Sequence, residues 1–154
     1  EFSSLLEKPR LVSIGFISED GTKQFYAELT DTYSSSDNSD FAKEQVIPLL
    51  DGGNLLSIDQ LKANLFKWIE QFDSEIELAS DNCKWDWPFI IELFKDDWPK
   101  NLSRDCFLLN MNYMKSADAF FDAVKRAYDN GLRKHHALDD AIANRLGWIA
   151  SENS

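Results

Sequence analysis

A histidine and an aspartate near the carboxyl end have the types and spacing of a catalytic pair. His135 lies five positions before Asp140, where the sequence predicts the start of a helix. A histidine in a loop and a carboxylate one turn into the following helix can face the same cleft. The imidazole could then move a proton, and the carboxylate could hold a divalent cation. A single histidine is more often an ordinary surface or core residue, so further acidic residues are needed.

Two other carboxylates are candidates for the same site. Asp86 lies in the stretch from Asn82 to Phe89, between a short predicted strand and a predicted helix. It could face a metal ion from this junction, or it could simply cap a helix that begins near Trp87, which is a common role for aspartate. Glu1, followed by Phe2, opens the sequence just before an apolar strand.

In this order, these patterns resemble the motifs of the DEDDh family of 3′-to-5′ exonucleases, which have an RNase H-like fold. His135 to Ala141 is similar to the last motif, His-x-Ala-x-x-Asp-Ala, and Asn82 to Phe89 is similar to the middle motif, Asn-x-x-aromatic-Asp-x-x-aromatic. Glu1 matches the glutamate of the first motif, Asp-x-Glu, whose aspartate would lie two positions earlier. We therefore expect a central strand and one metal ligand to precede Glu1, in preference to a protein that lacks them.

The hairpin sequence is similar to that of small bacterial exoribonucleases of the mycobacterial adenylate-preferring type. These enzymes share the Leu-x-Ser-Ile-Gly strand found at 11–15, the Glu-Asp-Gly turn at 19–21 and an aromatic-rich return strand. The resemblance thus extends over nearly the whole chain. It implies an enzyme that hydrolyses phosphodiester bonds from the 3′ ends of single-stranded RNA, and a homodimer is compatible with it.

The resemblance also implies a role for each matching residue. Glu1, Asp86 and Asp140, with the upstream aspartate, would hold two Mg²⁺ or Mn²⁺ ions, and oxygen ligands suit these cations. His135 would be the general base of a two-metal mechanism, and Asn82 would shape the loop before Asp86. The residues next to His135 and Asp140 are expected to have ordinary structural roles. His136 is expected to be a surface or core histidine whose hydrogen bonds are satisfied, and Asp139 an exposed acid of the first helical turn.

Residues around the motifs could contact the substrate. Arg133 and Lys134, with Lys125 and Arg126, form a basic group just before His135 and could bind backbone phosphates, although solvated surface charge is an equal alternative. Phe2 could stack on the terminal base, or it could pack in the core at the end of the sheet.

The bulk properties limit the function classes. The net charge of −11 argues against a protein that coats nucleic acid, but not against an enzyme that grips a few terminal nucleotides with the help of metal ions. The alternatives that stay open are a DNA exonuclease of the proofreading or repair type and a catalytically inactive module that binds nucleic acid or protein. The two cysteines, Cys83 and Cys106, are expected to be reduced.

The chain of 154 residues is predicted to form one domain, 1–154. Without a bilayer-length apolar run or a signal peptide, it is expected to be soluble and cytoplasmic, with no membrane partner. An antiparallel hairpin followed by alternating strands and helices predicts an α/β fold, an RNase H-like mixed sheet flanked by helices. Strands are expected at 10–18, 23–29, 75–79 and 106–109, and helices at 58–72, 85–94, 117–128 and 138–150. Ser57 with Gln60 forms a capping box for the helix at 58–72, and Ser116 can cap the helix at 117–128. Phe121 and Leu146 are expected to face the core from the last two helices.

Overall fold

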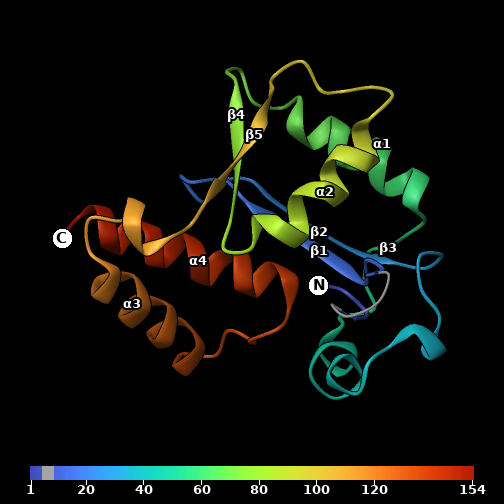
Figure 1. The fold of residues 1–154 in the computed structure, drawn as a ribbon, viewed down its shortest axis with the longest axis horizontal. Coiled ribbons are helices and arrows are strands. Elements are labelled where there is room, and N and C mark those ends of the chain that lie inside the picture. The colour runs from blue at the N-terminus through green and yellow to red at the C-terminus, as the bar shows by residue number, and fades with distance from the viewer. Residues whose placement is uncertain (5–8) are drawn as a thin grey trace.

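The chain folds into an α/β structure in which helices pack against strands of mixed direction (Figure 1). The coordinates are a computed structural model that describes residues 1–4 and 9–154. The predicted fold class, α/β with antiparallel and parallel strands flanked by helices, is confirmed at this level. No helix in the described part of the chain has the length and apolar character needed to cross a membrane.

The predicted hairpin forms the first sheet. Strands β1 (Ser13–Ile17) and β2 (Gln24–Leu29) pair antiparallel, with Ser13 opposite Glu28, and the two-residue strand β3 (Leu55–Leu56) runs parallel to β2. The turn forms because Gly21 adopts a left-handed φ of 79°, and the Asp20 carboxylate accepts a hydrogen bond from the amide of Thr22. The hairpin therefore follows from the turn chemistry and the apolar strands that flank it.

A second sheet has two strands, which come from the middle of the chain. Strands β4 (Ile76–Ser80) and β5 (Leu102–Leu108) are parallel, and helix α2 (Cys83–Phe94) connects them. In the described residues the two sheets are separate, where the sequence analysis expected one mixed sheet.

Helix α1 (Ile58–Ile69) supplies most of one face of the hydrophobic core. It begins at the predicted capping box, in which Ser57 accepts from the amide of Gln60 and the Gln60 side chain accepts from the amide of Ser57. The helix buries four apolar side chains: Leu61, Leu65, Trp68 and Ile69. These pack in one cluster with buried residues of α2, β2 and β5.

Helices α3 (Ala117–Asp129) and α4 (Ala137–Glu152) lie side by side (Figure 1). Their contact depends on Gly147 of α4, where a Cβ atom would lie 2.7 Å from Phe120 and 2.8 Å from Val124. Phe121 and Leu146 were expected to face the core, but their exposed fractions are 53% and 39%. This expectation was wrong because small residues, including Gly147, let the two helices approach closely on a neighbouring face.

The cysteines also differ from expectation. The structure joins Cys83, the first residue of α2, to Cys106 of β5 in a disulfide, with the Cα atoms 6.4 Å apart. The two positions are 23 residues apart in sequence, but the parallel pairing of β4 with β5 brings Cys106 opposite Leu78, near the end of the strand that leads to Cys83. Sequence spacing alone does not reveal this adjacency.

Candidate metal centre

Three of the predicted site residues meet in the structure. Glu1, His135 and Asp140 each offer a ligand atom, and these atoms lie within 4.8 Å of one another. The His135 Nδ1 atom is 3.9 Å from Glu1 Oε1. Residues from opposite ends of the sequence therefore form one partly buried group that could hold a cation.

Backbone pairing places Glu1 at this site. The Val12 amide donates to the Glu1 carbonyl at 2.9 Å, and Phe2 forms an antiparallel bridge with Leu11. The Phe2 ring packs edge-on against Phe89, with the ring centroids 6.4 Å apart. This packing favours the core role over base stacking among the two alternatives for Phe2.

The close approach of α4 to β1 brings in the histidine and the aspartate. At Gly15 of β1, a Cβ atom would lie only 2.5 Å from backbone atoms of Ala137 and Leu138, so the start of α4 rests directly on the strand. Any larger residue at this position would separate α4 from β1. The glycine thus links the fold to the site, because Asp140 lies in the first turn of α4.

His135 adopts an uncommon backbone conformation beside Asp140. Its φ is 71°, in the left-handed region that a histidine rarely occupies. Its amide donates to both carboxylate oxygens of Asp140 at 3.1 Å. The imidazole packs edge-on against Phe41, with a centroid distance of 5.0 Å. Burial lowers the pKa of His135, with a further contribution from Lys134, while Asp140 acts in the opposite direction.

Asp140 has a second partner that the sequence analysis did not single out. The Tyr128 hydroxyl of α3 donates to Asp140 Oδ1 at 2.8 Å. Burial and this contact with Asp140 raise the pKa of Tyr128 well above its usual value. In the sequence, Tyr128 has no feature that separates it from the other apolar residues of an amphipathic helix; only its place in the last turn of α3, near the loop to His135, could have suggested the contact.

The carboxylates of the site repel one another. Burial is the largest cause of a rise in the pKa of Glu1 to about 7, and the neighbouring Asp140 and Asp86 carboxylates raise it further. Crowded carboxylates are stabilised by a bound cation, which removes the repulsion between them. The donor set therefore fits a hard divalent metal ion such as Mg²⁺ or Mn²⁺.

Asp86 lies at the edge of the group. It is in the first turn of α2, near enough for its charge to affect Glu1, and it accepts a hydrogen bond from the Ser80 hydroxyl. The alternative that Asp86 caps a helix beginning near Trp87 is wrong, because α2 begins at Cys83 with Asn82 as the preceding residue. The Asn82 side chain makes no capping bond, but the backbone amide of Asn82 donates to Ser80 Oγ at 2.8 Å.

The residues just before and after His135 have different roles. Arg133 pairs with Asp51 at 2.5 Å and with Asp139 at 2.7 Å, whereas Lys134 is exposed. His136 is a buried histidine with several polar partners, which confirms its expected structural role. Asp139 was expected to be exposed but is buried, because it turns inward to accept hydrogen bonds from Arg133.

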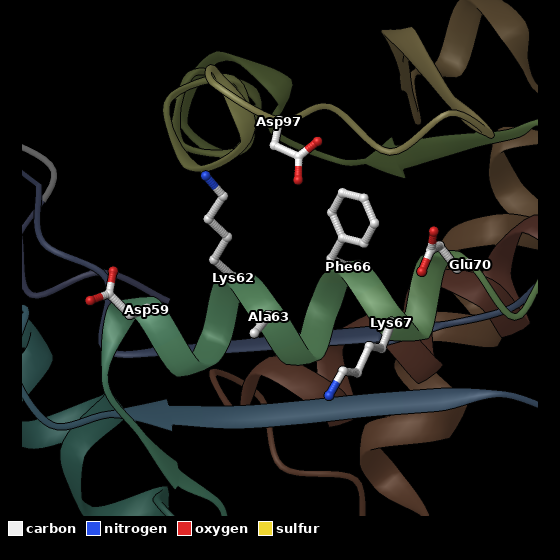
Figure 2. A pocket seen from close by; sticks show the side chains of 7 residues that line it. All are labelled: Asp59, Lys62, Ala63, Phe66, Lys67, Glu70 and Asp97. Atoms are coloured by element: carbon white, nitrogen blue, oxygen red, sulfur yellow. The ribbon is translucent and has the colours of Figure 1, made fainter.

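A hollow of about 390 Å³ lies elsewhere, between α1 and the segment that follows α2 (Figure 2). Lys62 and Phe66 point from α1 toward the side of Asp97 in this view. The residues that line the hollow carry charges of both signs, and none of them belongs to the group formed by Glu1, His135 and Asp140. It therefore adds nothing to the candidate centre.

The fold and the site define an α/β protein with a partly buried group of two carboxylates and one histidine suited to a divalent cation. Comparison of the chain with models of known protein families, and with curated proteins, finds no match.

Proposed function

We propose that this protein is a metal-dependent 3′-to-5′ exoribonuclease with an RNase H-like, DEDDh-type site. The observation that carries the proposal is the convergence of Glu1, His135 and Asp140. The resemblance assigns these residues to two motifs that are separated by most of the chain, and the structure brings them within 4.8 Å. RNA and its 3′ end come from the resemblance and belong to the proposal.

The acidic residues would hold the metal ions. Glu1, Asp86 and Asp140 would bind two Mg²⁺ or Mn²⁺ ions, together with the aspartate that the first motif expects two positions before Glu1. The raised pKa of Glu1, about 7, supports this assignment, because it reflects burial and negative charge that a cation would compensate. The chemistry that such ions supply is polarisation of the phosphodiester and stabilisation of the leaving oxygen.

The other residues of the site would move the proton and hold the substrate. His135 would accept a proton from the attacking water, and burial favours the neutral imidazole that this role requires. Its backbone amide is fixed by Asp140, so base and carboxylate form one unit. Exposed Lys134 would contact a backbone phosphate, and Asn82 would shape the loop before Asp86. A homodimer and a cytoplasmic location complete the proposal.

The test is degradation of 5′-labelled and 3′-labelled RNA and DNA oligomers by the full-length protein in Mn²⁺. We expect the wild type to shorten 5′-labelled RNA stepwise and to release the 3′ label as a mononucleotide, and Asp140→Ala to lose this activity. Asp129→Ala is a matched control, since Asp129 is an exposed acid that pairs only with Lys125 among its described ion pairs.

The outcomes separate the three candidate functions. Faster degradation of DNA than of RNA would favour the repair-type exonuclease. If the wild type is as inert as Asp140→Ala but still binds oligomers, a binding module is favoured and the proposed hydrolase is refuted.

A further inference from the structure

A closed ring of polar side chains, formed by Asp51, Arg133, His136 and Asp139, lies next to the candidate centre. Asp51 contacts Arg133 Nη1 through Oδ1 at 2.5 Å and His136 Nε2 through Oδ2 at 3.3 Å. Asp139 completes the ring, because it accepts from Arg133 Nε at 2.7 Å and lies 3.3 Å from His136 Nδ1. Three members come from one short segment, and Asp51 comes from a loop 82 residues earlier.

The ring is built into the protein interior on one side. The side chain of His136 is 1% exposed and that of Asp139 is 12% exposed, and the His136 ring packs on Tyr26 with a centroid distance of 4.6 Å. Arg133 also donates to the carbonyl of Leu49 at 3.3 Å, next to Asp51 in the same loop. The Arg133 and Asp51 side chains are 39% and 45% exposed, so their ion pair contributes little to overall stability, and its effect is on the local geometry of the turn.

Two members of the ring, Arg133 and His136, flank His135 in the sequence. Arg133 and His136 lie on either side of Lys134 and His135, and the His136 amide donates to the Arg133 carbonyl at 3.2 Å, which closes a tight turn. His135 holds its left-handed φ of 71° within this turn. For a residue other than glycine this conformation costs roughly 1–2 kcal/mol, so surrounding contacts must maintain it.

We propose that Asp51 is a positioning residue that keeps His135 in its left-handed conformation by clamping Arg133 and His136 from outside the turn. The inference rests on the proposed function, in which His135 is the general base. It also gives Arg133 a role other than phosphate binding, since two carboxylates and a carbonyl already accept its donors. Asp51 then supports the proposed general base without being one of the proposed metal ligands.

A double-mutant cycle in the full-length protein tests this role, with Asp51→Ala, Arg133→Ala and the combined variant. Displacing a catalytic group by 1 Å can reduce the rate about 100-fold, so we expect each single variant to lower kcat by about tenfold to 100-fold. KM should stay within about twofold, because substrate binding is not the function lost. The combined variant should be hardly slower than either single one, because both substitutions release the same clamp.

A second measurement does not depend on activity. The chain contains two histidines, so selective ¹⁵N-histidine labelling gives two backbone amide signals, those of His135 and His136. In Asp51→Ala, the His135 amide should change its chemical shift and exchange faster with solvent, because its hydrogen bonds to Asp140 loosen. Asp51→Asn keeps an acceptor for Arg133 and should lie between Asp51→Ala and the wild type. Asp37→Ala, which removes an exposed partner of Arg10, should leave both kcat and the His135 signal unchanged.

The results separate this proposal from the proposed function. If the wild type is inert on every oligomer, the exonuclease is refuted, while the His135 amide still shows whether Asp51 holds the turn. An unchanged His135 signal and an unchanged kcat in Asp51→Ala would overturn the positioning role. So would an Arg133→Ala variant that raises KM and reduces the salt dependence of RNA binding independently of Asp51, since that result would make Arg133 a phosphate ligand.

Discussion

Replacing Gly15 with alanine should disturb the site from a position outside the group formed by Glu1, His135 and Asp140. The new Cβ would lie 2.5 Å from the carbonyl carbon and oxygen of Ala137 and from the Cα of Leu138. All three are backbone atoms at the start of α4, so no side chain can rotate away. To restore a contact of 3.4 Å, the start of α4 must move by about 1 Å.

This displacement sets the size of the expected losses of stability and of activity. Overpacking of this kind costs about 1–3 kcal/mol, and the lower chain entropy of unfolded Gly→Ala variants offsets roughly 0.4–1 kcal/mol. We therefore expect the free energy of unfolding to fall by about 1–2 kcal/mol, or a Tm lower by roughly 2–8 °C in a chain of this length. Because Asp140 and His135 move with α4, the proposed nuclease activity should fall about 100-fold, more than the loss of folded protein explains.

Thermal and urea unfolding, combined with kcat at a temperature where both proteins are folded, measure these effects separately. Gly53→Ala is the matched control, since a Cβ at Gly53 meets nothing within 4 Å. The reasoning about close approach would be refuted by a Gly15→Ala protein that is as stable and as active as the Gly53→Ala protein.

Three further predictions concern the centre and the disulfide. A proton competes with the cation for the Glu1 carboxylate, whose pKa is about 7, so Mn²⁺ affinity should weaken about tenfold per pH unit below this value and level off above it. Calorimetric titrations of Mn²⁺ between pH 5 and pH 8 test this prediction, and an affinity that does not change with pH contradicts it. Tyr128→Phe removes the hydrogen bond to Asp140 but keeps the ring, so Mn²⁺ binding should weaken about tenfold with little change in Tm. Equal Mn²⁺ affinity of the wild type and Tyr128→Phe would show that the hydroxyl does not orient the Asp140 carboxylate. Reduction of the Cys83–Cys106 disulfide, which closes a loop of 23 residues, should lower the free energy of unfolding by about 3 kcal/mol in urea, and Cys83→Ala should be equally destabilised and insensitive to dithiol reagents.

Local chemistry explains the parts of the fold that the sequence predicted well. The capping box of Ser57 and Gln60 placed the start of α1 correctly, and Ser116 does the same for α3. The hairpin could equally be predicted from the sequence, because its turn needs a left-handed conformation that Gly21 adopts readily. Such features depend on residues within a few positions of each other, so their physical causes can be read directly from the chain.

Contacts between distant segments were harder to predict. The inward faces of α3 and α4 were assigned from large apolar residues, yet Phe121 is exposed and Gly147 is buried. Periodicity identifies an apolar stripe but does not say which neighbouring helix will approach it, or how closely. A glycine that permits close approach has no side chain to contribute to the pattern.

The same distinction applies to the site. Motif order was sufficient to select Glu1, His135 and Asp140, because a resemblance describes residue types at fixed spacing. It gave no information about Asp51, which lies outside every motif and joins the site through two contacts to Arg133 and His136. Arg133 shows why this matters: its charge alone suggested a phosphate ligand, but whether a guanidinium is available depends on which carboxylates the fold places beside it. The availability of a charged group is a property of the tertiary structure, so a candidate substrate contact needs its intramolecular partners identified before a role is assigned.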